Sequence, residues 1–276
     1  MPVFSFFGLF YLVVFIFNWR VSAEERKFKI GSVPYLNAAP LTRGIESELI
    51  FATPSKLAEQ LRRGELDAAL VSITEVLFHD NYDILDGIAI ASLGEVYSVI
   101  LAHKKPLEQV TEVYCDTASL TGVNLLKVLL AERKLFPQFK PLESYKSAAQ
   151  KDFVLLIGDP AIDFQRSKHS HEIFDLGAEW SEMTRLPFVY AVWALRRGIE
   201  NKDLRYELRE SKNFGIETID YIIETREEYD EDFRRDYFEW NIQYDLAEDQ
   251  KRGIERFCQL LEKHKLGKIF PPKFVS

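Results

Sequence analysis

The sequence predicts an α/β fold in which a parallel or mixed sheet is covered by helices. Short apolar, β-rich runs alternate with helical patterns through most of the chain. These runs lack polar alternation, as expected of strands that are buried on both faces. The chain has 276 residues, of which 47% are hydrophobic and 28% charged, so it can bury a sizeable core without disulfides or metals.

The strands and helices follow one another in a regular order. A helix is predicted between the second and third strands, because Pro54 opens it, Leu57 and Leu61 share one face and Gly64 ends it. A second helix is predicted over residues 123–133. The predicted strands are residues 28–33, 49–53, 68–73, 88–92, 98–102, 112–115, 153–158 and 188–195.

The C-terminal part, from about residue 200, is charged and helix-forming, and helices are predicted over 211–229 and 246–264. Residues 217–240 contain ten acids and three bases, so almost all of the net charge of −8 lies there. Two interpretations are open: a solvated helix face that aids solubility, or an acidic docking surface. The acidic total argues against a general nucleic-acid-binding protein, which would carry a basic face.

The first 22 residues form a hydrophobic leader with no charged side chain from Met1 to Trp19. A helix of this length would span about 28 Å. Three interpretations are open. In the first, the segment is a signal peptide cleaved near Ala23, although no Lys or Arg precedes the apolar run. In the second, it is an N-terminal anchor that leaves the body in the cytoplasm. In the third, translation begins near Val21, and the protein then has no membrane contact.

The usual catalytic and metal-binding motifs are absent. Cys115 and Cys258 have neither the number nor the spacing of a disulfide framework or a metal site. The sequence contains no GxSxG, no P-loop, no HExxH and no GxGxxG after a strand. His169 and His171 lie in a stretch rich in Lys, Ser and Glu, which is typical of an exposed loop. We therefore expect no metal.

Small polar residues lie where the apolar runs begin or end. Asn37 lies in a turn after the first predicted strand, and Ser98 begins a strand after a glycine turn. In open α/β sheets, ligands bind beyond the carboxyl ends of strands. Asn37 is therefore either a ligand contact or a cap of the following helix.

Two further polar groups are candidates for a binding site. Ser119, Thr121 and Gly122 precede the helix predicted over 123–133, where hydroxyls and free backbone N–H groups can hold a carboxylate or phosphate. An ordinary N-cap is the alternative interpretation of this segment. Asp159 follows Gly158 at the end of a strand and is either a hydrogen-bonding group at a hinge or an N-cap.

Together these segments resemble the chorismate dehydratase family of the futalosine route to menaquinone. The resemblance covers nearly all of residues 27–270. Its motifs are G-x-V-x-Y-L-N-x-x-P-L at 31–41, LRRGELDAA at 61–69, S-x-G-x-V-x-S-V at 92–99, D-x-x-S-x-T at 116–121, I-G-D-x-A at 157–161 and D-L-G-x-x-W-x-x-x-T-x-L-P-F-V-x-A-x-W at 175–193. Several motifs in the same order are more specific than any single one.

The resemblance implies a two-lobed fold like that of type II periplasmic binding proteins, with the ligand in the cleft between the lobes. Residues 23–110 and 195–276 are expected to form lobe one, and residues 111–194 lobe two. The implied reaction is loss of water from chorismate, which gives 3-[(1-carboxyvinyl)oxy]benzoate in the cytoplasm without a cofactor. No oligomeric state is predicted.

The resemblance also suggests roles for the candidate residues. Asn37 and Ser98 match the active-site Asn and Ser of the family and are expected to be catalytic, fixing the ring and the leaving hydroxyl. Substrate binding is expected of Ser119, Thr121, Gly122 and Asp159. Where many relatives have S-R-T-S, this chain has Ser-Leu-Thr-Gly at 119–122. The alternative function is a solute-binding protein for a small carboxylate, because a fold does not fix a function.

Overall fold

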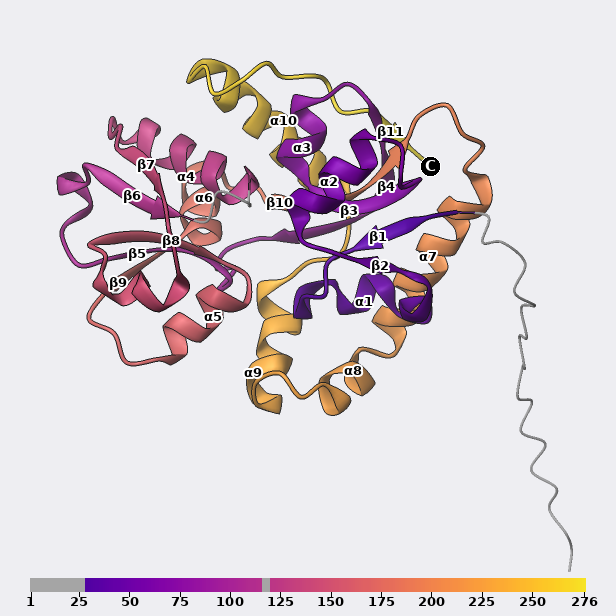
Figure 1. Ribbon diagram of the computed structural model, residues 1–276, viewed down its shortest axis with the longest axis horizontal. Coiled ribbons are helices and arrows are strands. Elements are labelled where there is room, and N and C mark those ends of the chain that lie inside the picture. Colours follow the sequence, from indigo (N-terminus) through magenta and orange to yellow (C-terminus); the bar gives the residue numbers. More distant parts are fainter. Residues whose placement is uncertain (1–27, 116–119) are drawn as a thin grey trace, which may run out of the picture.

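The computed structural model describes residues 28–115 and 120–276, which form two α/β lobes (Figure 1). We call the lobe that holds the larger sheet the first lobe. Its six strands are, in spatial order, β11 (Phe274–Val275), β4 (Tyr82–Ser92), β10 (Phe188–Arg196), β3 (Ala68–Ser72), β1 (Ile30–Ser32) and β2 (Ile50–Phe51). The sheet is mixed, because β1 and β3 are parallel while β10 is antiparallel to both β3 and β4.

Helices cover both faces of the first sheet (Figure 1). One face carries α2 (Pro54–Arg62), α3 (Ile73–Phe78) and α10 (Glu248–Lys263), and the other carries α1 (Ala39–Thr42) and α7 (Lys202–Glu217). Helices α8 (Ile219–Thr225) and α9 (Glu231–Asp236) continue from α7. Because both faces are covered, four of the five residues of β3 are buried, which explains its unbroken apolar sequence.

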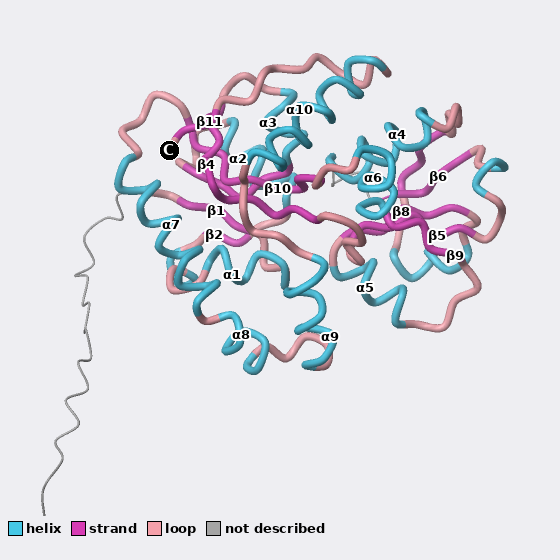
Figure 2. Tube along the Cα trace, turned by 180° about the vertical axis from the view of Figure 1, so that it is seen from behind, coloured by secondary structure: helices cyan, strands magenta, loops and turns pink. Residues whose placement is uncertain are grey.

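The second lobe is built on a five-stranded sheet. In spatial order its strands are β7 (Gln138–Pro141), β6 (Glu112–Cys115), β8 (Phe153–Ile157), β5 (Val99–His103) and β9 (Glu172–Asp175). Helices α4 (Leu120–Glu132) and α6 (Leu176–Thr184) lie on one side of this sheet, and α5 (Asp159–Arg166) lies on the other (Figure 2). The predicted mixed α/β architecture with two lobes is therefore confirmed.

The pairing of strands divides the chain at other points than the boundaries expected at 110 and 194. Strand β5, which the expected boundaries place in lobe one, pairs with β8 and β9 of the second lobe. Strand β10, most of which they place in lobe two, pairs with β3 and β4 of the first. The sequence misleads at these two strands because an apolar run does not show which distant strand its backbone will pair with.

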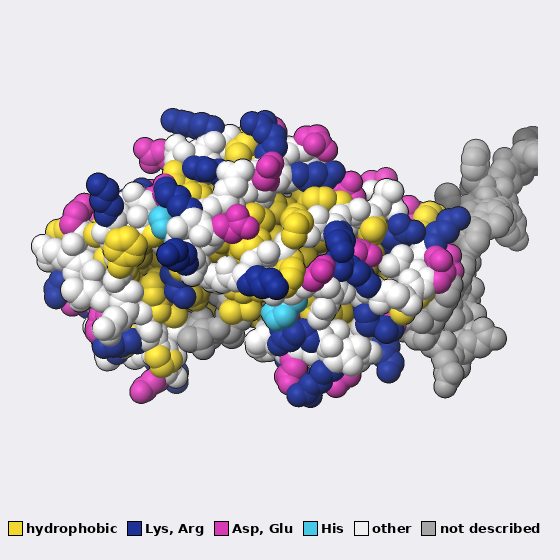
Figure 3. All heavy atoms as spheres, turned by 90° about the horizontal axis from the view of Figure 1, so that it is seen from above, with side chains coloured by type: hydrophobic (Ala, Val, Ile, Leu, Met, Phe, Trp, Pro, Cys, Tyr) yellow, Lys and Arg dark blue, Asp and Glu magenta, His cyan; other side chains and the backbone are white. Residues whose placement is uncertain are grey.

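The charged C-terminal part wraps around the first lobe as several helices. The helix expected over 211–229 is divided at Thr218 into α7 and α8. After α9, residues Tyr237–Asn241 form a π-helical turn that leads toward the space between the lobes. Basic and acidic side chains are interspersed on the face shown in Figure 3.

The leader over residues 1–22 lies outside the described residues. Within 28–115 and 120–276, no helix combines the length and the apolar composition needed to cross a membrane.

Candidate functional site

A cavity of about 100 Å³ lies where the two sheets meet. Both lobes contribute to its wall, and none of the described residues that line it carries a formal charge. Most of the wall is apolar, with a few hydroxyls and one amide, which is the usual composition of a small-molecule site. The lining residues are Val33, Tyr35, Asn37, Pro54, Leu70, Val71, Ser72, Ile90, Val96, Ser98, Val99, Thr121, Gly122, Ile157, Gly158, Tyr190, Ala191 and Ile242.

Asn37 lies in a short 3₁₀ turn, Leu36–Ala38, directly after β1. Its side chain caps neither this turn nor α1, so the alternative interpretation as a helix cap is wrong. The Oδ1 atom is buried, and no donor among the described residues reaches it. A buried acceptor without a partner is costly unless a ligand supplies the donor, so this atom is available for a ligand.

Ser98 precedes β5, at the point where the chain crosses from the first lobe to the second. The residue is buried, and its Oγ accepts a hydrogen bond of 2.8 Å from the hydroxyl of Tyr237. Its own hydroxyl hydrogen faces the Val96 carbonyl at 3.4 Å, which is long for an O–H···O bond. This geometry leaves the Ser98 hydrogen available to a ligand in the cavity.

The loop before Ser98 is held in an unusual conformation. Tyr97 has a φ of 64°, a left-handed value that is rare for a residue other than glycine. Its N–H donates to Asp175 Oδ2 at 2.8 Å, and its carbonyl accepts a hydrogen bond from the side chain of Gln165. Its ring packs against Phe233, with centroids 5.2 Å apart. These contacts hold the turn that aims Ser98 into the cavity.

Asp175 connects this loop to α6. Its carboxylate accepts from the N–H groups of Val96 and Tyr97 and from those of Gly177 and Ala178 in the first turn of α6. Burial raises the pKa of Asp175, while the backbone donors act in the opposite direction. In the sequence, Asp175 is the first residue of the motif at 175–193. Its position just before a helix is the local signal of an N-cap.

Tyr237 contacts Ser98 but was not among the residues predicted from the sequence. It lies in the π-helical turn after α9. This turn belongs to the acidic stretch 217–240, for which a solvated face or a docking surface is expected. The side chain of Tyr237 is nonetheless almost fully buried, at 1% exposure. Burial raises the pKa of Tyr237 well above its ordinary value, while hydrogen bonds with Ser98 and Asn37 act in the opposite direction. The phenol is therefore neutral and able to donate near pH 7.

Thr121 and Gly122 line the cavity, but both also serve packing between elements. Thr121 Oγ1 donates to Thr74 Oγ1 of α3 at 3.0 Å and accepts from the Thr74 N–H at 3.2 Å, so it joins the two lobes. A Cβ on Gly122 would lie 2.5 Å from Ile157 Cδ1, so glycine allows α4 to approach β8 closely. Ser119 lies outside the described residues.

Asp159 does not line the cavity, although its neighbour Gly158 does. It begins α5, after Gly158 turns the chain with a φ of 69°. Burial, together with Asp163 and Glu228, raises the pKa of Asp159, and Arg226 opposes that shift. The structure therefore brings Asn37, Ser98, Thr121 and Gly122 together and leaves Asp159 just outside them.

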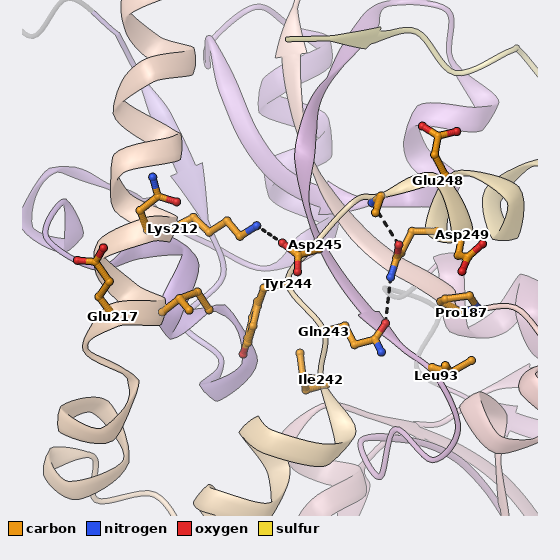
Figure 4. Close-up of a pocket in the computed structure, with 14 residues that line it drawn as sticks. Leu93, Pro187, Lys212, Glu217, Ile242, Gln243, Tyr244, Asp245, Glu248 and Asp249 are labelled. Atoms are coloured by element: carbon orange, nitrogen blue, oxygen red, sulfur yellow. Dashed lines mark hydrogen bonds and ion pairs between the residues drawn. The ribbon is translucent and has the colours of Figure 1, made fainter.

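A larger groove of about 970 Å³ shares the lining residue Ile242 with this cavity (Figure 4). It is lined mainly by α7 and by the segment 242–250. Its polar side chains bond to one another: Lys212 pairs with Asp245, and Gln250 donates to Gln243 at 3.0 Å. None of the candidate residues lines this groove, so its size alone does not make it the reactive site.

The two histidines of the HxH sequence lie in the loop between α5 and β9. His171 bonds through Nε2 to the Lys151 carbonyl at 2.8 Å, and His169 stacks on Phe164 with centroids 4.8 Å apart. Burial lowers the pKa of His171. Across the described parts of the chain, no three His, Cys, Asp or Glu side chains are grouped as metal ligands.

Comparisons with known proteins add a family and a fold. A family model described as menaquinone biosynthesis matches residues 28–263. A chorismate dehydratase of Thermus thermophilus is 34% identical over 280 residues, which cover 90% of this chain and 98% of that protein. A chorismate dehydratase of Campylobacter jejuni is 28% identical over 232 residues, which cover 82% and 89% of the two chains.

Similar solved structures share the architecture at low sequence identity. A protein of Archaeoglobus fulgidus superposes with a TM-score of 0.68 at 19% identity, over 87% of this chain and 98% of that one. The periplasmic aliphatic sulphonate binding protein SsuA of Escherichia coli gives a TM-score of 0.58 at 13% identity, over 88% and 94%. These likenesses confirm the predicted periplasmic-binding-protein-like fold.

Proposed function

Because this chain belongs to the menaquinone biosynthesis family, we propose that it is a chorismate dehydratase, a hydro-lyase that converts chorismate to 3-[(1-carboxyvinyl)oxy]benzoate in the cytoplasm. The observation that carries the proposal is the cavity between the lobes, into which Asn37 and Ser98 both project. Two relatives that span most of this chain are chorismate dehydratases.

The uncharged cavity suits this reaction. Loss of water removes a ring hydrogen and the neighbouring hydroxyl, and the ring becomes aromatic. Such a step is strongly downhill, so orientation and exclusion of water contribute more than a strong acid or base. Asn37 and Ser98 are proposed to fix the ring and the leaving hydroxyl through their amide and hydroxyl groups.

The enolpyruvyl carboxylate of the substrate is proposed to accept the ring proton. Among the described lining residues, only Tyr35 and Tyr190 have titratable side chains. Burial raises the pKa of Tyr190 well above its ordinary value, so this phenol is a poor base near neutral pH. The electron pair of the broken C–H bond enters the ring as hydroxide leaves, and that hydroxide becomes water by taking up the proton that the enolpyruvyl carboxylate has accepted.

The remaining candidate residues are proposed to bind the substrate. Thr121 and Gly122 form part of the cavity wall at the start of α4, where backbone N–H groups favour a carboxylate. Ser119, just before that helix, is proposed to contribute to the same carboxylate contact. Asp159 is proposed to contact the substrate at the edge of the cavity, next to Gly158.

The proposal is tested by incubating the purified protein with chorismate and following the mixture by mass spectrometry. A dehydratase will produce a species lighter than chorismate by one water, in amounts that exceed the protein many times over. The test also distinguishes the enzyme from a solute-binding protein with the same fold. Chorismate that is bound but recovered unchanged would refute the dehydratase.

A further inference from the structure

We propose that Tyr237 is a positioning residue that sets the direction of the hydrogen bond made by Ser98 in the cavity. Because Tyr237 donates to it, Ser98 donates in turn to a substrate hydroxyl, and Asn37 accepts from the same hydroxyl. The inference rests on the proposed dehydration, because this hydroxyl is the group that leaves as water. Three observations support it.

The first observation is the bond between Tyr237 and Ser98. The tyrosine hydroxyl donates to Ser98 Oγ at 2.8 Å, and both residues are buried. A serine oxygen that accepts a hydrogen bond still has its own hydrogen to donate. The only acceptor found for that hydrogen among the described residues is the Val96 carbonyl at 3.4 Å, which a ligand oxygen at normal distance would replace.

The second observation is the free acceptor on Asn37. Its Oδ1 is buried without a donor from the described residues, and Asn37 lines the same cavity as Ser98. An amide oxygen can only accept a hydrogen bond, so a ligand group that meets this atom must donate to it.

The third observation is that Tyr237 is held rigidly. It lies in a π-helical turn, a rare conformation that is often found at functional sites. Its ring stacks on Phe233 with centroids 5.6 Å apart and packs against Phe238 at 6.1 Å. Burial keeps the phenol protonated, so it acts as a donor to Ser98 throughout the neutral range.

A donor and an acceptor that line the same cavity match a hydroxyl group, which both donates and accepts. When the ring carbon to oxygen bond breaks, the oxygen gains an electron pair, and the hydrogen bond from Ser98 to this oxygen becomes stronger. Stabilisation that grows during bond cleavage raises kcat more than it lowers KM. Loss of Tyr237 is therefore expected to act mainly on kcat.

The test compares Tyr237→Phe with the matched variant Tyr244→Phe. Tyr244 is another buried tyrosine of the same segment, but its hydroxyl has no partner among the described residues. Phenylalanine keeps the ring packing at both positions. We expect Tyr237→Phe to lower kcat about tenfold with KM within about twofold, and Tyr244→Phe to leave both unchanged.

Ser98→Ala provides the second arm. If Tyr237 acts through Ser98, the double variant Ser98→Ala with Tyr237→Phe will lose no more activity than Ser98→Ala alone. Equal kcat in Tyr237→Phe and Tyr244→Phe, or losses that multiply in the double variant, would refute the role of Tyr237 while the dehydratase function stands. A wild-type protein that does not dehydrate chorismate would refute both.

Discussion

Asp175 shows how a single side chain shapes the site without lining the cavity. Its carboxylate holds two N–H groups of the loop before Ser98 and two of the first turn of α6. It also supports the left-handed backbone of Tyr97, which has a φ of 64°. The conformation of Tyr97 costs energy, and the structure keeps it because several fixed contacts act on the same residue.

We expect Asp175→Asn to lower both stability and activity. The amide keeps the oxygen that three of the N–H groups share but directs an NH₂ group at the Tyr97 N–H, which leaves that N–H without its acceptor. The expected loss in the free energy of unfolding is about 1–3 kcal/mol. Denaturant unfolding measures this loss, and the rate of chorismate dehydration reports the displacement of Ser98.

A matched control is Asp152→Asn. Asp152 is half exposed and pairs with Lys105 at 2.7 Å on the surface, so its loss is expected to leave the free energy of unfolding nearly unchanged. If the two variants had equal stability and equal activity, the role assigned to Asp175 would be wrong.

At the level of elements, α4 and α10 are joined across the lobes by polar contacts. Glu132 at the end of α4 forms an ion pair with Lys263 and a hydrogen bond with His264 at the end of α10. The hydrogen bond from Lys263 is the largest cause that lowers the pKa of Glu132, and His264 acts in the same direction. Because the pKa is lower in the folded state, the ionised carboxylate contributes stability at neutral pH, and this contribution is lost as the pH falls below about 4.5.

We expect Glu132→Gln to reduce the free energy of unfolding at pH 7 by less than about 1 kcal/mol, because its partner Lys263 is largely exposed. The variant will also lose less stability than the wild type between about pH 5 and pH 3, since it has no carboxylate to protonate. Urea unfolding across this range measures both effects. Glu224→Gln changes an exposed glutamate on α8 and serves as the control. An identical acid response in all three proteins would contradict the assignment.

At the level of the whole molecule, several contacts hold the lobes together around the cavity. Thr121 bonds to Thr74. Helices α5 and α9 lie side by side (Figures 1 and 2), and Arg166 of α5 pairs with Asp230 at the start of α9. The enclosed volume is about 100 Å³, below the 300–1,000 Å³ of ordinary ligand pockets. The structure therefore shows the two lobes close together around a small cavity.

Much of the fold could be predicted because local pattern determines it. Strands such as β3 and β8 are apolar along their length since both faces are covered. The partners of β5 could not be predicted, because its neighbours β8 and β9 come more than 45 residues later in the chain, and no local signal encodes that pairing. The same limit explains the misplaced lobe boundaries.

The composition of the cavity wall could also be predicted only in part. The presence of Asn37 and Ser98 there could be predicted, since each adjoins an apolar strand and belongs to a family motif. Tyr237 could not, because one inward-facing aromatic residue among many charges gives no periodic signal. Its contact with Ser98 depends on how the C-terminal helices fold back over the first lobe.

If the cavity between the lobes dehydrates chorismate, Asn37 is essential to this reaction. The most direct measurement is the turnover of chorismate by the wild type, by Asn37→Ala and by Asn213→Ala, which removes an exposed amide from α7. We expect loss of one water by the wild type, an unchanged rate in Asn213→Ala and a loss of about a hundredfold in Asn37→Ala. Near-normal turnover by Asn37→Ala would show that the reaction does not depend on this amide.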